Sequence, residues 1–212
     1  MSEGQSKWKQ DFFDKAESIA LKDPLAYTLG AVSEGELLIF KYADAVKLAG
    51  HSCPAVSGAY KITAKALKFL YENDTPVRGD IKVVIKGKPT DLAYGPMSQV
   101  ISLITGAAPV TGFRGIGGQF NRQNLLTFDE DNFEYNTFIF YRIDNGQGVK
   151  ITYDTSVLPQ NPKMGDLMQE VFSGSASKEA HEEFINLWQG KVKKILLDDD
   201  KYPGLFKVEE IL

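Results

Sequence analysis

Cysteine and histidine are scarce in this 212-residue sequence, which contains one cysteine and two histidines. A single cysteine forms no disulfide within the chain and excludes a four-cysteine zinc module. Any metal in this protein must therefore be held mainly by histidine, carboxylate or backbone ligands, with at most one thiolate.

Long hydrophobic runs and an excess of basic residues are also missing. No apolar run approaches the roughly 20 residues that span a bilayer, and the first residues show neither a continuous hydrophobic region nor a small-residue cleavage site. The formal net charge of −4 gives no basic footprint for nucleic acid. We therefore expect a cytoplasmic protein that binds neither a membrane nor nucleic acid.

The composition, 43% hydrophobic and 25% charged, is typical of a chain that buries one core. We expect a single domain over residues 1–212, with an N-terminal helix within 1–22, a core over 23–158 and C-terminal helices over 159–212. Apolar residues at helical spacing predict helices over residues 5–21, 54–71, 95–106, 163–172 and 178–197. Strand-like runs cover residues 25–32, 36–43, 80–87, 124–128, 134–143, 149–154 and 205–211. Because these elements do not alternate regularly, the pattern indicates an α+β fold, with a mixed or antiparallel sheet and hairpins in the second half.

The cysteine and one histidine lie two residues apart in the stretch GHSCP, residues 50–54. Pro54 suits the first turn of a helix, which places Cys53 at the N-cap, where free backbone N–H groups and the helix dipole favour a thiolate. His51 can share a metal with that sulfur or act as its base. The alternative is ordinary packing, because a lone cysteine is usually a buried core residue.

Two other stretches hold candidate residues. Asp91 and Tyr94 follow a predicted strand, where side chains commonly gather; Asp91 is a ligand, a general base or a helix cap. The glycine-rich stretch GFRGIGGQFNRQN, with Arg114 and Asn124, brings backbone N–H groups toward an anion. It matches neither the phosphate-loop nor the dinucleotide pattern, so a flexible lid or the start of a hairpin is the alternative to a cofactor-binding loop.

Three segments resemble the FmdE family, named for the FmdE component of formylmethanofuran dehydrogenase: AVKLAGHSCPAVSGAYKITAKAL, YGPMSQVISLITGA and FNRQNLLTF. In that family a His-Gly-His-x-Cys-Pro-Gly motif opens a long helix, a second helix ends in Thr-Gly, and a Gly-Lys-Gly-Asn-Leu stretch begins antiparallel hairpins. The resemblance implies an α+β core that forms a homodimer. It also implies a divalent transition metal, zinc first and nickel or iron as alternatives, at His51 and Cys53.

The sequence departs from the family pattern at several positions. Ala49 stands in place of the first motif histidine, Ala55 in place of the last glycine, and Tyr94 where a cysteine often follows the strand. The cysteine-rich zinc-binding tail of many members is not present in this sequence. A site that has lost ligands binds metal weakly, binds another group, or serves another reaction.

Three functional hypotheses remain open. The first is a metalloenzyme for a small-molecule ligand, in which Cys53, Asp91 and Tyr94 are catalytic and the glycine-rich loop closes the pocket. The second is a non-catalytic carrier of metal or cofactor, or an accessory component of a larger complex. The third is a metal-free Cys-His nucleophile with Asp91 as the orienting group.

Overall fold

A computed structural model, which describes residues 6–211, contains a five-stranded sheet and a two-stranded sheet. In the larger sheet the strand order is β4-β3-β5-β6-β7; β3 and β4 are parallel, and the other neighbours are antiparallel. The smaller sheet pairs β1 with β2. The strands are β1 (Ile19–Leu21), β2 (Leu38–Phe40), β3 (Ile81–Ile85), β4 (Leu126–Phe128), β5 (Thr137–Arg142), β6 (Gly148–Tyr153) and β7 (Phe206–Ile211).

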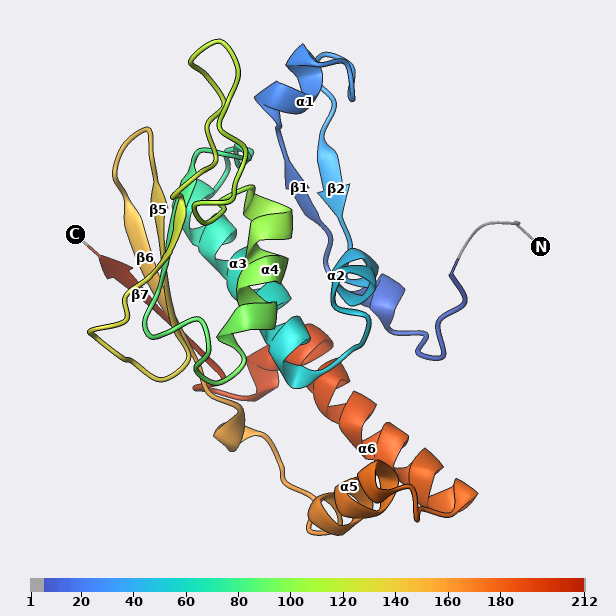
Figure 1. Cartoon of the computed structure of the whole chain (residues 1–212). Coiled ribbons are helices and arrows are strands. Elements are labelled where there is room, and N and C mark those ends of the chain that lie inside the picture. The colour runs from blue at the N-terminus through green and yellow to red at the C-terminus, as the bar shows by residue number, and fades with distance from the viewer. Residues whose placement is uncertain (1–5, 212) are drawn as a thin grey trace.

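Two helices, α3 and α4, form a layer between the two sheets. Two others, α5 and α6, form a pair that projects from it (Figure 1). Helices α3 and α4 lie against the five-stranded sheet, and α2 with the β1–β2 pair covers their other side (Figure 1). The α5–α6 pair extends away from this body (Figure 1). The helices are α1 (Pro24–Thr28), α2 (Tyr42–Ala49), α3 (Pro54–Tyr71), α4 (Tyr94–Thr105), α5 (Met164–Ser173) and α6 (Lys178–Leu197), with short 3-10 turns at Phe13–Lys15, Thr155–Val157 and Asp199–Lys201. The predicted α+β class is thereby confirmed.

Local sequence explains the two central helices. Pro54 occupies the first turn of α3, whose buried face includes Ala59, Ile62 and Ala66, all without exposed surface. Helix α4 ends at Gly106, whose φ of 76° is a left-handed conformation that glycine adopts easily. Four of the predicted helices, all except that over 5–21, are confirmed to within one residue at each end.

The N-terminal expectation is wrong. The described part of the predicted helix over 5–21 contains only a 3-10 turn at Phe13–Lys15, and then strand β1; residue 5 itself lies outside the described residues. Phe12 and Phe13 are buried in the core, at 3% and 4% exposed. Ile19–Leu21 instead pairs with β2, so its backbone groups are satisfied by a neighbouring strand rather than by helical hydrogen bonds.

The strand predicted over residues 25–32 is also wrong. Asp23 caps a helix there, because its carboxylate accepts hydrogen bonds from the N–H groups of Leu25 and Ala26, each at 3.1 Å, and Pro24 occupies the first helical position. Of the run over 36–43, only Leu38–Phe40 is a strand, and α2 begins two residues later. The later predicted strands are all found, each within three residues of its predicted bounds.

Asp199, two residues after the C-terminal end of α6, holds that end against α3. Its carboxylate receives Lys61 Nζ at 2.9 Å and Lys65 Nζ at 2.6 Å, and only 13% of the Asp199 side chain is exposed. Desolvation by burial raises the pKa of Asp199, but hydrogen bonds from Lys65 and Lys61 outweigh it and lower the pKa overall. This contact keeps α6 beside the helix that bears Cys53.

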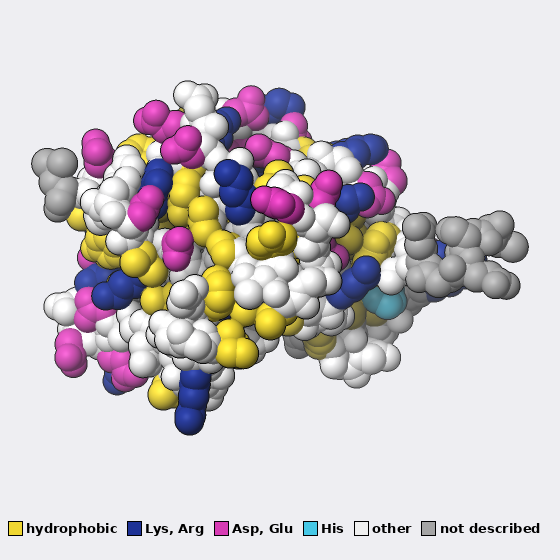
Figure 2. Space-filling model, turned by 90° about the horizontal axis from the view of Figure 1, so that it is seen from above, with side chains coloured by type: hydrophobic (Ala, Val, Ile, Leu, Met, Phe, Trp, Pro, Cys, Tyr) yellow, Lys and Arg dark blue, Asp and Glu magenta, His cyan; other side chains and the backbone are white. Residues whose placement is uncertain are grey.

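Within residues 6–211, the helices are too short or too polar to cross a bilayer. The face seen from above mixes Lys and Arg side chains with Asp and Glu, and a band of hydrophobic side chains runs between them (Figure 2). On that face, among the described residues, neither sign of charge dominates a large area.

Candidate functional site

Cys53 is the N-cap of α3, as the sequence predicts. Its Sγ accepts the N–H of Val56 at 3.4 Å, and its extended backbone (φ −149°, ψ 170°) leads into the helix. The thiol is free and buried, at 9% exposed. A sulfur in this position lies at the positive end of the helix dipole and accepts a backbone N–H there.

The approach to the N-cap is held by α6. The indole N–H of Trp188 and the side-chain amide of Gln189 both donate to the Ser52 carbonyl, at 3.0 and 3.1 Å. Ser52 Oγ also lies 3.1 Å from Gln189 Oε1, to which it donates, and 2.8 Å from the Tyr42 hydroxyl. The last helix, far away in sequence, thus fixes the backbone next to Cys53.

Two buried phenols, those of Tyr42 and Tyr153, form hydrogen bonds with the residues on either side of Cys53, which are Ser52 and Pro54. The Tyr153 hydroxyl donates to the Pro54 carbonyl at 2.8 Å. Burial raises the pKa of Tyr153 and of Tyr42 well above the usual range, and the nearby Cys53 raises both further. Because both phenols stay protonated, they act here as hydrogen-bond donors and not as bases.

His51 lies on the exposed approach to Cys53. Its Nδ1 is 2.9 Å from the Ala49 carbonyl. With Nδ1–H as the donor, the lone pair is on Nε2, which forms no hydrogen bond within residues 6–211; this is the arrangement of many metal-binding histidines. Among the described residues, however, no group of three or more His, Cys, Asp or Glu side chains is close enough to hold a metal.

Asp91 and Tyr94 neighbour one another at the start of α4. A Cβ added at Gly87 would lie 2.8 Å from Tyr94 Cε2 and 3.1 Å from Asp91 Oδ2, so both side chains pack on this glycine. The Asp91 carboxylate accepts the Lys88 N–H at 2.8 Å and does not cap α4, whose N-cap is Ala93. Tyr94 has no exposed surface.

The hydroxyl of Tyr94 is used within the fold. It donates to the Glu134 carbonyl at 3.0 Å and lies 3.4 Å from the Lys86 carbonyl. Burial raises the pKa of Tyr94, and Asp91 and Tyr135 add to that effect. The N-termini of α3 and α4 lie at the same end of the helix layer (Figure 1), yet no hydrogen bond among the described residues joins Tyr94 or Asp91 to Cys53. A catalytic role for these two residues stays a prediction.

The glycine-rich loop lies at the other end of the helix layer, near the end of α4 (Figure 1). Helix α4 has 12 residues, so at about 1.5 Å per residue about 18 Å separates its two ends. Arg114 and Asn124 are both exposed on this loop, and Asn124 has a φ of 60°. The expectation that the loop closes over Cys53 is therefore wrong, and the structure does not bring Arg114 or Asn124 to His51 and Cys53.

Arg122 of this loop belongs to a buried cluster of charged side chains, together with Asp23 and Arg78. Its Nη2 contacts the two carboxylate oxygens of Asp23 at 2.8 and 2.9 Å, and Arg78 Nη1 contacts Asp23 at 2.9 Å. Desolvation by burial raises the pKa of Asp23, but hydrogen bonds from Arg122 and Arg78 outweigh it and lower the pKa overall. The cluster ties the loop to the start of α1, which gives it a structural role.

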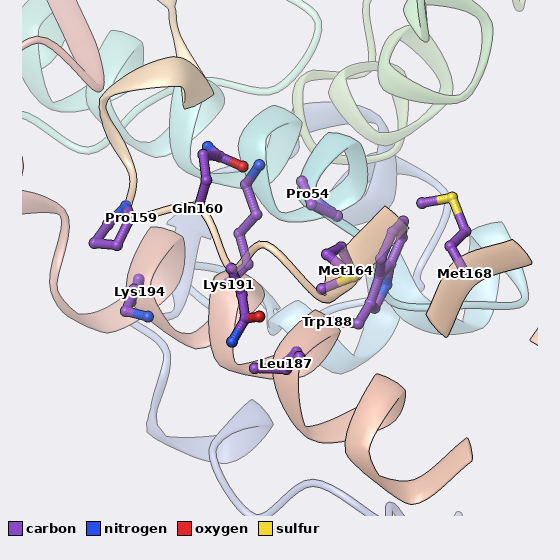
Figure 3. Close-up of a pocket in the computed structure, with 10 residues that line it drawn as sticks. Pro54, Pro159, Gln160, Met164, Met168, Leu187, Trp188, Lys191 and Lys194 are labelled. Carbon is purple, nitrogen blue, oxygen red and sulfur yellow. The ribbon is translucent and has the colours of Figure 1, made fainter. Parts of the chain in front are cut away.

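A pocket that the sequence reasoning missed lies between α5, α6 and the start of α3 (Figure 3). It has a volume of about 490 Å³. Its lining consists of Pro54, Pro159, Gln160, Asn161, Met164, Met168, Leu187, Trp188, Lys191 and Lys194. The available indication was that Lys191 follows Trp188 by three residues and Lys194 follows Lys191 by three, because residues at that spacing are neighbours on a helix surface.

Comparison with known proteins identifies the family of this chain. Residues 48–202 match the family model described as FmdE, molybdenum formylmethanofuran dehydrogenase operon, so the chain belongs to the FmdE family. It is similar to a solved structure, that of a tungsten formylmethanofuran dehydrogenase FmdE-like protein from Syntrophus aciditrophicus. That similarity has 15% identity and a TM-score of 0.39, and covers 81% of this chain and 72% of the other. Among curated proteins no significant match is found.

Proposed function

We propose that this FmdE-family protein binds a divalent transition metal, zinc first and nickel or iron as alternatives, through Cys53 and His51. The proposal rests on one local arrangement: Sγ of Cys53 accepts a backbone N–H at the helix N-terminus, and His51 Nδ1 is engaged by the Ala49 carbonyl. A thiolate and a neutral imidazole are donors that zinc, nickel and iron accept. The carbonyl contact is the kind of outer hydrogen bond that orients a histidine ligand.

Two side-chain donors leave a four-coordinate shell incomplete. We infer that the remaining positions are taken by water, by a small-molecule ligand, or by residues of a second copy in a homodimer. A bound metal of this kind would act as a Lewis acid toward a coordinated oxygen.

Binding and transfer of metal suit this site better than catalysis. A general acid or base must lie within hydrogen-bond reach of the reacting group. Asp91 and Tyr94 are already engaged by backbone groups, and the phenols of Tyr42 and Tyr153 are buried and protonated. We therefore propose that the protein is a carrier of the metal or an accessory component of a larger complex.

Titration of metal-free protein with Co²⁺ tests the proposal, because a thiolate ligand gives an intense sulfur-to-cobalt absorption band. The band should appear in the wild type and be absent in Cys53→Ser. His51→Ala should weaken Co²⁺ binding by at least the roughly 10–100-fold that loss of an outer partner costs. His181→Ala, which removes the other histidine, exposed on α6, is the matched control and should leave binding unchanged. A wild type without the band, or a Cys53→Ser variant that keeps it, would contradict the proposal.

A further inference from the structure

The pocket between α5 and α6 combines an apolar wall with two ammonium groups. The apolar part consists of Pro54, Pro159, Met164, Met168, Leu187 and Trp188. Met164 and Met168 lie around the Trp188 ring (Figure 3). The indole N–H of Trp188 is already used on the Ser52 carbonyl, so the ring offers its apolar surface to the pocket.

The two lysines of the pocket, Lys191 and Lys194, are half-buried. Among residues 6–211 neither ammonium forms an ion pair or a hydrogen bond, and the lining contains no carboxylate. Burial alone lowers the pKa of Lys191, because no acidic group opposes it. Two lysines that line one largely apolar pocket therefore have no acidic partner among the described residues.

Two of the three acidic side chains of the same helix pair with other lysines. Glu182 binds Lys9 at 2.6 Å, and Glu183 binds Lys163 at 2.9 Å. The lack of a partner at Lys191 thus reflects its position beside the pocket and not a shortage of carboxylates on α6.

We propose that this pocket binds a small organic anion whose carboxylate or phosphate group is held by the pocket lysines, Lys191 and Lys194, and whose apolar body packs on Trp188. Its volume lies within the roughly 300–1,000 Å³ of small-molecule sites. A half-buried ammonium gains most from an anion that enters with an apolar body, because water is then excluded from the contact. The inference goes beyond the metal proposal and does not depend on it.

The pocket adjoins the N-terminus of α3. Pro54 lines it directly, and Trp188 both forms its wall and holds Ser52, the residue before Cys53. A bound anion would thus contact the elements that position the Cys53 thiol.

Calorimetric titration of metal-free protein with 1-naphthoate tests the inference, with neutral 1-naphthamide as the matched ligand. Naphthoate should bind at least about tenfold more tightly than the amide. The double change Lys191→Met with Lys194→Met should abolish that preference, whereas Lys193→Met, at an exposed position between them, should leave it intact. Titration with 1-naphthyl phosphate shows which anionic group the pair prefers.

Further measurements separate this inference from the metal proposal and from a loss of folding. Naphthoate should quench Trp188 fluorescence in a Trp8→Phe background, where Trp188 is the remaining tryptophan, and the Cys53→Ser variant should bind naphthoate as well as the wild type. The double lysine variant should keep its urea midpoint or raise it, because it removes two uncompensated charges. Equal binding of naphthoate and naphthamide would overturn the inference. So would absence of binding in a dimer whose lysines are protected from acylation, since a second copy would then cover the pocket.

Discussion

Gly58→Ala should destabilise the protein, although alanine is the better helix former. Gly58 lies in α3, facing Tyr153 of β6. A Cβ at this position would lie 2.4 Å from Cε1, 2.6 Å from Cζ and 3.0 Å from the hydroxyl oxygen of Tyr153. The ring has little room to move, because it is 2% exposed and stacks on Phe206 at a centroid distance of 5.0 Å.

The magnitude follows from three opposed effects. Alanine gains about 1 kcal/mol over glycine in helix propensity, while an extra methyl forced into a packed core costs about 1–3 kcal/mol. Displacement of Tyr153 also strains its hydrogen bond to the Pro54 carbonyl, at 2.8 Å, a contact of about 1 kcal/mol. We expect a net loss of about 2 kcal/mol in the free energy of unfolding.

Urea denaturation followed by circular dichroism measures this loss. Gly190→Ala is the matched control, because Gly190 lies in α6 with no atom within 4 Å of an added Cβ, and this change should stabilise by about 0.5–1 kcal/mol. Tyr153→Leu in the Gly58→Ala background should recover part of the loss, which a double-mutant cycle would show as coupling. The packing argument is refuted if Gly58→Ala stabilises the protein as much as Gly190→Ala does.

Three further predictions follow from other parts of the structure. Asp23→Asn should cost about 3–5 kcal/mol of unfolding free energy by chemical denaturation, because it leaves Arg78 and Arg122 without their buried carboxylate; a loss below about 1 kcal/mol would contradict this. Because the folded-state pKa of Asp23 is lowered, its ionised form stabilises the protein above the ordinary value of 3.8, and this contribution is lost as pH falls through the folded pKa. Urea midpoints measured from pH 7 downward should therefore fall below about pH 4 more steeply in the wild type than in Asp23→Asn, and parallel curves would refute it. Static light scattering should give about twice the chain mass of 23.5 kDa, as a homodimer requires, and a mass of one chain would contradict it.

The sequence predicted the central and C-terminal elements because their local features agree with their packing. Helix α3 has proline at its first position and an unbroken apolar face, and α4 ends on a glycine with positive φ. The prediction failed in the N-terminal region because a proline after an apolar stripe fits the end of one helix as well as the start of another. In the structure Asp23-Pro24 marks a start. The spacing of Phe12, Phe13 and Ile19 fits a helix too, and only the pairing of β1 with a strand almost twenty residues later selects the extended form.

The candidate site was predictable only where it is local. The N-cap placement of Cys53 follows from the proline beside it. The partners of Ser52, by contrast, come from Trp188 and Gln189, more than 130 residues away, and no periodicity within one helix reveals such a contact. A glycine-rich loop is a common lid, which suggests a place for Arg114 at the site, but the chain order does not reveal which end of the helix layer the loop covers.

The phenylalanines of β5 are not available to a dimer interface. Phe138 and Phe140 of β5 are fully buried within one chain. An aromatic strand satisfied by its own core gives no support for an interface, so the homodimer remains a prediction that rests on the family resemblance and on the two-donor metal site.

Metal content of untagged protein after reconstitution with zinc, nickel or iron tests the central claim most directly. Elemental analysis of the wild type, after removal of loosely bound ions, should show a metal bound in stoichiometric amount. The Cys53→Ser and His51→Ala double variant should retain none, while remaining folded by circular dichroism. A wild type that retains no metal under all three conditions, or a double variant that retains as much as the wild type, would contradict the metal site at the start of α3.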